Sequence, residues 1–493
     1  MELWSAAERE VAVAIGELGR VNPFLPERRL WERRALGEAF VPGPAVWSLG
    51  DTDNPNVDRV EQVSEDLAER VRRRLEHRAP TPEERELYGG LVFMVLYNRY
   101  AHEIPPPEQE DVQPVVSCWE RYLADFRRFF RHAAPPDPDV DTPEHLLACF
   151  WQIRRAFELV LTSFAGGSMS AARLRAATWQ STFTHDARRY RRFLYRTMPD
   201  VPTLITGPTG TGKELVARAV GLSGYVPFDR ERRRFAFAPT FLPLNLSALS
   251  PALVESELFG HRKGSFTGAT ADRVGWLARC PRGGTVFLDE IGELDPLLQV
   301  KLLRVLEDRT FAPVGDERAL RFVGKIVAAT HRDLPQAIGE GVFRADLYYR
   351  LAGDRIEAPS LRTRLDEDPG ELRRILQVVV SRTVGPEYAV GVTEEVLAEI
   401  LKVRGASYGW PGNVRELAQV ARNVVVQGTC GPPEALSSAG GPASPFAELE
   451  LGELPLREVD RRYARHVHAM RGSYKATADV LGVDWRTVRS LVD

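Results

Sequence analysis

A glycine-rich loop that ends in a lysine occupies residues 207–214, which read GPTGTGKE. The apolar run TLIT precedes this loop, and the helical pattern LVARAV follows it. Glycines let backbone N–H groups turn inward around phosphate oxygens, and the start of a helix adds positive potential. Lys213 is placed to reach the β- and γ-phosphates of a nucleotide. The pattern predicts a phosphate-binding loop made of Gly207, Pro208, Thr209, Gly210, Thr211, Gly212, Lys213 and Glu214.

Two carboxylates end a second apolar run, GTVFLDE, about 75 residues further along the chain. In a parallel sheet both acids would lie at the carboxyl edge, next to the phosphate-binding loop. Asp289 can hold Mg²⁺ through its water shell, and Glu290 can polarise the water that attacks the γ-phosphate. Glu214 stands where such loops usually carry the Ser or Thr that contacts magnesium. The loop and the two acids predict a site that hydrolyses ATP with Mg²⁺ as cofactor.

Five short β-rich runs alternate with helical patterns and would position these residues. They are TLIT (203–206), FLPLN (241–245), GTVFLDE (284–290), GKIVAAT (324–330) and DRIEAP (354–359). Strands that alternate with helices indicate βαβ units and a mainly parallel sheet. From about 361 to 427 the pattern becomes helical, as in a small lid. Residues 428–445 are rich in Gly, Pro and Ser, which is typical of a flexible linker.

The first 170 residues lack strand alternation and contain several helical patterns, which proline clusters separate. In the run 64–77, Ser64 can cap a helix whose Leu67, Val71 and Leu75 share one face. We find no catalytic or metal-binding pattern in this region. We therefore expect an all-helical N-terminal domain.

Composition and charge exclude several classes of protein. The chain has 493 residues, 44% hydrophobic and 27% charged, which excludes a mostly disordered or collagen-like chain. Its longest nearly uninterrupted apolar run, residues 88–97, is far shorter than the ~20 residues of a membrane helix. The net charge of −3 requires any nucleic-acid footprint to be local. The four cysteines lack metal-ligand spacing and the acidic N-terminus is unlike a leader peptide, so we expect a cytoplasmic protein that does not contact the membrane.

A loop with two glycines, an aromatic ring and a hydroxyl lies between the two halves of this site, at residues 264–269 (GSFTGA). Such a loop could respond to the nucleotide and present Phe266 to a partner. It could equally be an ordinary turn between helices. The residue types alone leave both interpretations open.

The hexapeptide GSFTGA resembles the GAFTGA signature of the sigma-54-dependent transcriptional activators, the bacterial enhancer-binding AAA+ ATPases. The resemblance extends almost continuously over residues 185–430, through blocks such as GPTGTGKELVARA, ESELFGHRKGSFTGA, FRADLYYRL and WPGNVREL. A glutamate at the position of Glu214 is usual in that family. The resemblance implies a ring, expected to be a hexamer, that hydrolyses ATP and remodels the sigma-54 RNA polymerase holoenzyme.

The resemblance also implies roles for individual residues. Asn245 matches the asparagine that restrains the catalytic glutamate, here Glu290, until nucleotide is sensed. Arg344 and Arg350 match arginines offered to the ATP of the neighbouring subunit, and a surface salt bridge is the alternative for either one. Arg415 matches the second sensor, which the lid carries. The residues implied to grip sigma-54 are Gly264, Ser265, Phe266, Thr267, Gly268 and Ala269.

Two segments depart from the family pattern. The first sensor usually reads Thr-Asn, whereas this chain has Thr330 and His331, whose imidazole can still donate a hydrogen bond. Residues 222–241 are longer than the usual connection and insert the basic segment RERRR. For this insertion we expect a solvated surface loop.

The last forty or so residues form a locally basic helical module, because residues 456–492 hold eight Lys/Arg against four Asp/Glu. The segment SYKATADVLGVDWRTVRSLVD has helix-turn-helix spacing, with Gly482 in the turn and Asp484 as the cap of the final helix. It is similar to the Fis-type domain that ends many activators of this family; a three-helix bundle with a solvated basic face is the alternative. The candidate DNA contacts are Arg471 and Lys475 to phosphates and Arg486, Thr487 and Arg489 to base edges.

We therefore expect a multidomain chain: an all-α N-terminal regulatory domain (1–175), a P-loop AAA+ α/β ATPase subdomain (176–360), its α-helical lid (361–430), a flexible linker (431–452) and an all-α helix-turn-helix domain (453–493). The favoured function is a sigma-54-dependent regulator tethered to upstream promoter DNA. The alternative is a DNA-binding regulator whose ATPase is weakened by His331 and which acts as a nucleotide-gated oligomerisation switch.

Overall fold

The computed structural model describes residues 2–47, 54–106, 113–431 and 456–492. The chain divides into two compact units, residues 1–430 and 431–493. Apart from residue 431, the predicted linker lies outside the described residues.

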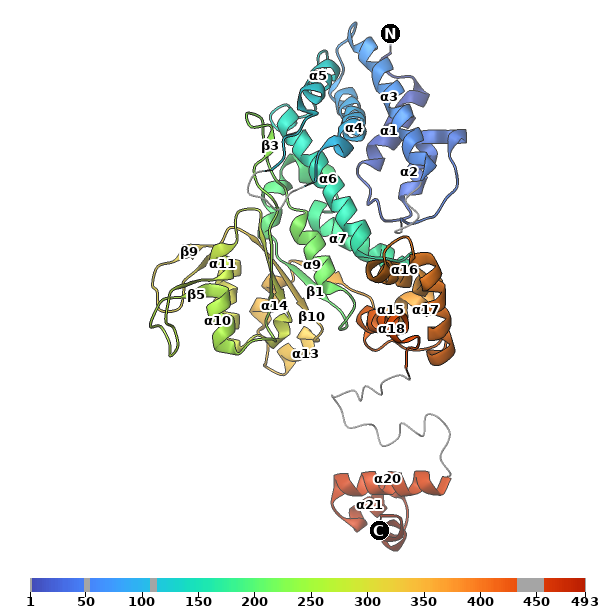
Figure 1. Cartoon of the computed structure of the whole chain (residues 1–493), viewed down its shortest axis with the longest axis vertical. Coiled ribbons are helices and arrows are strands. Elements are labelled where there is room, and N and C mark those ends of the chain that lie inside the picture. The colour runs from blue at the N-terminus through green and yellow to red at the C-terminus, as the bar shows by residue number, and fades with distance from the viewer. Residues whose placement is uncertain (1, 48–53, 107–112, 432–455, 493) are drawn as a thin grey trace. The chain divides into compact units, whose positions relative to one another are not determined.

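Helices make up the regular structure of the described residues before 201, as Figure 1 shows. Ser64, expected to cap a helix, instead lies buried inside α3, where its hydroxyl donates to the Val60 carbonyl at 2.6 Å. Asn54 caps that helix, because its side-chain oxygen accepts from the N–H of Asn56 at 3.0 Å, and Pro55 is the first helical residue. The expected domain boundary after residue 175 falls inside α7. The helices are α1 (Ala6–Leu18), α2 (Arg28–Leu36), α3 (Pro55–Leu75), α4 (Pro82–Tyr100), α5 (Trp119–Phe129), α6 (Pro143–Ser163), α7 (Met169–Phe183) and α8 (Ala187–Arg192).

A five-stranded parallel sheet lies at the centre of the first unit, in the order β11–β1–β10–β7–β4. All five predicted β-rich runs are strands of this sheet, so the α/β prediction is confirmed. The register pairs Asp289 with Ala329 on one side and with Asn245 on the other, which brings the ends of three strands together. The strands are β1 (Thr203–Thr206), β4 (Phe241–Asn245), β7 (Thr285–Asp289), β10 (Lys325–Thr330) and β11 (Asp354–Glu357).

Helices cover both faces of this sheet, because alternate strand residues point to opposite sides. Ile205 and Val327 pack in one core with α6, α7 and α9, whereas Leu204 and Ile326 pack in another with α12 and α14. The remaining elements of this part are α9 (Lys213–Leu222), α10 (Pro251–Phe259), α11 (Trp276–Arg279), α12 (Pro296–Asp308), α13 (Leu334–Gly339), α14 (Ala345–Leu351), β5 (Gly260–His261), β6 (Arg273–Val274), β8 (Thr310–Phe311) and β9 (Leu320–Arg321).

The insertion 222–241 was expected to be a solvated surface loop, which holds for its exposed basic residues 230–233 but not for the residues on either side of them. It forms an antiparallel pair, β2 (Phe228–Asp229) and β3 (Arg234–Phe235), packed against the N-terminal helices. The ring of Phe235 stacks on Trp151 at 3.7 Å between centroids, and the N–H of Val116 donates to the Arg233 carbonyl at 2.9 Å. The charge of the basic segment was the reason for expecting a solvated loop. The aromatic residues on either side of that segment determine where the insertion packs.

The predicted lid is helical and comprises α15 (Leu361–Glu367), α16 (Glu371–Val384), α17 (Ala389–Arg404) and α18 (Asn413–Gln427), with a hydrophobic core of its own. The second unit contains α20 (Leu456–Arg471), α21 (Tyr474–Leu481) and α22 (Trp485–Val492). Its small core includes Val467, Ala478 and Val488. Across both units, no described helix has the length and apolar character needed to cross a membrane.

Candidate nucleotide site

The glycine-rich loop connects β1 to α9, with Lys213 as the first residue of the helix. Gly207 and Gly210 have φ of 144° and 80°, a region that other residues rarely adopt. A Cβ on Gly207 would lie 2.4 Å from the Ala358 carbonyl oxygen, and one on Gly210 would lie 2.3 Å from the Gly412 carbonyl oxygen. Both glycines are therefore required by conformation and by space.

The Lys213 side chain is folded back over the loop. Its Nζ donates to the carbonyl oxygens of Gly207 at 2.9 Å and Pro208 at 3.2 Å. Burial lowers the pKa of Lys213, and the nearby carboxylates of Glu290 and Asp289 oppose that shift. A phosphate group in the loop would offer this ammonium a stronger acceptor than two carbonyls.

Asp289 and Glu290 lie at the carboxyl end of β7, as the sequence predicts. Burial raises the pKa of Asp289, and the Glu290 charge raises it further. A divalent cation would relieve both effects, so this carboxylate fits Mg²⁺ chemically. The described residues contain no group of three metal-ligating side chains. Mg²⁺ here would depend on Asp289, water and the nucleotide phosphates, as is usual for this ion.

His331 contacts the candidate catalytic base directly. Its Nδ1 lies 2.7 Å from Oε2 of Glu290, and its backbone N–H donates to the same oxygen at 3.3 Å. Asn245, expected to restrain Glu290, has its Oδ1 on the backbone and hydroxyl of Ser247 instead, at 2.9 and 2.8 Å. Thr330 is buried next to His331, and its hydroxyl accepts from the backbone N–H of Arg332.

The lid touches the glycine-rich loop through the first turn of α18. Asn413 Nδ2 donates to the Thr209 carbonyl at 2.9 Å, and the Arg415 backbone N–H donates to the Gly210 carbonyl at 3.3 Å. Asn413 has φ of 52°, a conformation that asparagine tolerates better than most residues. Sequence analysis selected Arg415 and missed Asn413. The Pro-Gly-Asn turn before α18 was the available signal.

These parts enclose a cavity of about 360 Å³, a size typical of small-molecule sites. One wall is polar and comprises the glycine-rich loop, Asp289, Glu290 and Arg415. The other wall is mostly apolar, which suits a nucleotide base opposite its phosphates. Sequence analysis missed this second wall, because it combines α16 with the end of α6. Its residues are Phe164, Ala165, Ile375, Val378 and Val379.

The turn between α6 and α7 is fastened to the lid by a buried carboxylate. Glu371 accepts from the backbone N–H groups of Gly167 at 2.7 Å and Ser168 at 3.2 Å, and from the Ser168 hydroxyl at 2.9 Å. The same carboxylate pairs with Arg364 at 2.6 Å, and both side chains are nearly inaccessible to solvent. The apolar wall of the cavity is thus held by a charged contact between distant segments.

Arg344 and Arg350 do not line this cavity in their own chain. Both are exposed. Arg344 forms a two-point ion pair with Asp346 at 3.0 and 2.7 Å, and Arg350 donates to the Leu306 carbonyl at 3.3 Å. Within one chain, Arg344 therefore forms the surface salt bridge that was the alternative to its role at a neighbouring subunit.

Residues 264–269 form the tip of the connection between the antiparallel strands β5 and β6. The N–H of Gly264 donates to the Ala269 carbonyl at 2.9 Å, and the N–H of Ala269 donates to the Phe266 carbonyl at 3.0 Å. Phe266 is 38% exposed, and its ring contacts His261. The loop is therefore a closed turn that presents an aromatic side chain.

In the second unit, α21 and α22 are joined by Gly482 in the left-handed conformation, and Asp484 accepts from the N–H of Arg486 at 2.8 Å. The turn and the cap are as the sequence predicts. The five candidate DNA contacts, Arg471, Lys475, Arg486, Thr487 and Arg489, are all exposed.

Comparison with known proteins places the site in a family context. A family model described as the Sigma-54 interaction domain matches residues 182–357. The transcriptional regulatory protein ZraR of Klebsiella oxytoca is 42% identical over 227 residues, 46% of this chain and 47% of the relative. The hydrogenase transcriptional regulatory protein HoxA of Bradyrhizobium diazoefficiens is 43% identical over 229 residues, 46% of this chain and 43% of the relative.

The chain thus spans about half the length of the curated relatives it matches. Among solved structures, NtrX from Brucella abortus in complex with ATP aligns with a TM-score of 0.41 and 22% identity. That alignment covers 82% of this chain and 86% of NtrX.

Proposed function

We propose that this chain is a sigma-54-dependent transcriptional regulator driven by ATP hydrolysis, because residues 182–357 match the sigma-54 interaction domain. The observation that carries the proposal is the cavity of about 360 Å³ that Lys213, Asp289 and Glu290 line together with Arg415 of the lid. A buried lysine and two carboxylates beside a glycine-rich loop are the groups that bind nucleotide phosphates and Mg²⁺.

In this mechanism Lys213 and the loop N–H groups hold the phosphates, while the apolar wall of α6 and α16 holds the base. Bound at Asp289, Mg²⁺ would neutralise phosphate charge. Glu290 takes the proton from the attacking water. Arg344 and Arg350 reach the ATP of a neighbouring subunit, and Arg415 senses the nucleotide from the lid. Hydrolysis therefore requires a ring, proposed to be a hexamer.

The loop 264–269 is the part that acts on the partner. Its exposed aromatic tip would press on sigma-54 in the RNA polymerase holoenzyme when the nucleotide state changes. The C-terminal unit would bind upstream promoter DNA through Arg486, Thr487 and Arg489 and raise the local concentration of the ring.

ATP turnover and transcription from a sigma-54 promoter, both measured with the full chain, test the proposal. Glu290→Gln is expected to lower turnover by about 10²–10⁴-fold and to retain ATP binding, since only the base is lost. Thr267→Ala is expected to retain turnover and lose transcription. An inactive wild type, or full transcription by Thr267→Ala, would refute the proposal.

A second candidate is a DNA-binding regulator that uses ATP as an oligomerisation switch. The hydrogen bond from His331 to Glu290 favours it, because that contact occupies the proposed base. This candidate predicts ATP-dependent assembly with turnover near background in the wild type. Turnover and sedimentation measured on the same samples separate the two functions.

A further inference from the structure

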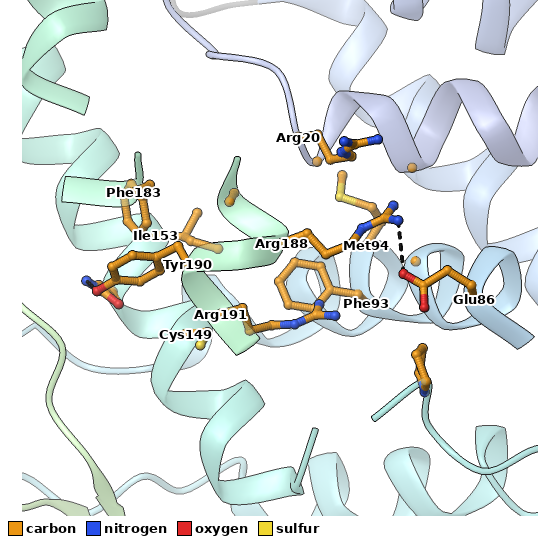
Figure 2. A pocket seen from close by; sticks show the side chains of 16 residues that line it. Arg20, Glu86, Phe93, Met94, Cys149, Ile153, Phe183, Arg188, Tyr190 and Arg191 are labelled. Atoms are coloured by element: carbon orange, nitrogen blue, oxygen red, sulfur yellow. Dashed lines mark hydrogen bonds and ion pairs between the residues drawn. The ribbon is translucent and has the colours of Figure 1, made fainter. Parts of the chain in front are cut away.

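A hollow in the N-terminal helical region takes no part in the nucleotide site. It has an inner part of about 50 Å³ and an outer groove of about 500 Å³. Figure 2 shows the inner part, whose apolar lining includes Phe93, Met94, Ile153, Phe183 and Tyr190. The two parts share the wall residues Gly16, Arg20, Glu86, Gly90 and Arg188.

Two glycines of the wall keep the hollow open. Gly16 in α1 and Gly90 in α4 have ordinary helical conformations, and a Cβ on either would have no neighbour within 4 Å. The adjacent Gly89 differs, since a Cβ there would lie 2.2 Å from Pro136. Glycine inside a helix is less favourable than alanine. Neither the backbone conformation nor the packing between helices requires glycine at positions 16 and 90. The effect of these two glycines is that no side chain occupies the hollow.

Arginines outnumber carboxylates around the inner part, where Arg20, Arg188 and Arg191 face Glu86 alone, whereas glutamates outnumber arginines around the outer groove. Arg20 also pairs with Glu17 at 2.6 Å. Glu86 pairs with both Arg188 at 2.9 Å and Arg192 at 2.8 Å. Burial lowers the pKa of Arg188, and the charges of Arg20 and Arg191 lower it further against the opposing effect of Glu86. In Figure 2, Arg188 reaches from α8 to Glu86 on α4 beside Phe93. An anion bound here would relieve the repulsion among the guanidinium groups.

The inner wall also holds an unpartnered polar atom. Gln152 is fully buried and donates through Nε2 to the Tyr190 hydroxyl at 2.6 Å and the Ser223 carbonyl at 2.8 Å. Its Oε1 has no hydrogen-bond partner among the described residues. A buried acceptor of this kind is costly to leave empty, and a ligand hydroxyl or a bound water would satisfy it.

One helix connects the hollow to the nucleotide cavity. Gln152 and Ile153 of α6 line the hollow, and Ser163 at the end of the same helix lines the cavity with Phe164. The distance along the helix from Gln152 to Ser163 is about 16 Å at 1.5 Å per residue. A displacement of α6 at one end therefore reaches the other.

We propose that this hollow binds a small monocarboxylate with an apolar body, its carboxylate on Arg188 and Arg20 and its body against Phe93 and Met94. Occupancy then alters the nucleotide cavity through α6. The proposed binding is argued only from the residues that line the hollow, whereas the proposed effect on ATP hydrolysis rests on the proposed function.

The first test measures thermal unfolding of the full chain without nucleotide. Phenylacetate and hexanoate are the probes, and their neutral amides, phenylacetamide and hexanamide, are the controls. The acids are expected to raise the melting temperature with increasing concentration, because a ligand of the folded state stabilises it, and the amides are not. Equal shifts with acids and amides, or no shift with either acid, would overturn the proposal.

Variants locate the binding. Gly90→Leu fills the hollow and is expected to abolish the shift caused by phenylacetate. Gly391→Leu is the matched control, because Gly391 is an exposed glycine of α17 with equally free space around its Cβ. Arg188→Gln is expected to lose the shift, and Glu86→Gln to enlarge it, since a competing carboxylate is removed. A full shift in Gly90→Leu would place the probe elsewhere and refute the site.

Coupling is measured separately, as ATP turnover of the full chain with and without phenylacetate. A change of about fivefold or more is expected in wild type and not in Gly90→Leu. A melting shift without any ATP turnover would refute the proposed function and leave the binding site standing. If phenylacetate raises the melting temperature but leaves the rate of ATP turnover unchanged, the coupling is refuted and the binding is not.

Discussion

The imidazole of His331 is hydrogen-bonded to the carboxylate of Glu290, at 2.7 Å between Nδ1 and Oε2. The backbone of His331 donates to the same oxygen. The residue that departs from the family pattern at the first sensor thus contacts the proposed base, whereas Asn245 is turned to Ser247. In this structure His331 determines where the Glu290 carboxylate points.

We predict that His331→Ala lowers kcat for ATP hydrolysis by about tenfold, the equivalent of one hydrogen bond to a charged group. KM for ATP should stay nearly unchanged, because His331 orients the base and does not line the nucleotide cavity. His331→Asn, which keeps a side-chain donor, should retain most of the rate. Steady-state kinetics of the three proteins would contradict this role if both variants lost the same amount.

Arg350→Ala is expected to lower turnover by about 10³-fold while ATP binding survives, because the guanidinium acts on the site of a neighbouring subunit. Lys213→Ala should be inactive for a different reason, since it fails to hold phosphate. Mixing the two variants should restore part of the activity. In a mixed ring, an Arg350→Ala subunit can bind ATP with its intact Lys213, and a neighbouring Lys213→Ala subunit can supply the intact Arg350. Arg318→Ala, another exposed arginine, is the control. No recovery in the mixture would argue against action between subunits.

Glu371→Ala should lower the free energy of unfolding by about 3 kcal/mol, because it leaves Arg364 buried without its partner. The change also frees the turn at Ser168 from the lid. Glu394→Ala removes an exposed partner of Arg373 and should cost less than about 1 kcal/mol. Urea denaturation of both variants measures the difference. Equal costs would show that the buried contact does not hold α7 against the lid.

Stability should fall as the pH drops below about 6.5, in part because of His145. Burial lowers the pKa of His145, whose ring lies 2.7 Å from the Tyr225 hydroxyl and 2.9 Å from the Arg191 carbonyl. The unfolded chain therefore binds a proton that the folded chain does not, and stability rises with pH through this range. His145→Gln should flatten that slope, and His102→Gln, at an exposed position, should not. Urea midpoints between about pH 5 and 8 measure it.

The order of motifs along the chain was enough to predict the central sheet. Alternation of β-rich and helical runs identified all five parallel strands. The three inner strands β1, β10 and β7 are mostly buried and therefore largely apolar, whereas the edge strands β4 and β11 are partly exposed. The same reasoning located Lys213, Asp289 and Glu290, since strand order brings the ends of β1 and β7 to one edge. The roles expected of these residues stay predictions until they are measured.

Local sequence patterns did not reveal contacts between distant segments. The hairpin of Phe228 and Phe235 was expected to be a solvated loop, because an aromatic residue shows its packing only when its neighbour, here Trp151, is known. The hydrogen bonds of Asn413 to the phosphate loop and of Ser168 to Glu371 each join segments about 200 residues apart. No local pattern encodes such pairs.

The sequence by itself determined the chemistry available to this protein, because a glycine-rich loop, its lysine and two carboxylates are properties of residue type and spacing. Tertiary structure decided which groups touch: His331 on Glu290, the end of α6 on the nucleotide cavity, and a hollow kept open by two glycines. The physical reason is that residue types and hydrophobic periodicity can be recognised within a short stretch of sequence. Packing and desolvation depend instead on which distant segments of the chain come into contact with that stretch.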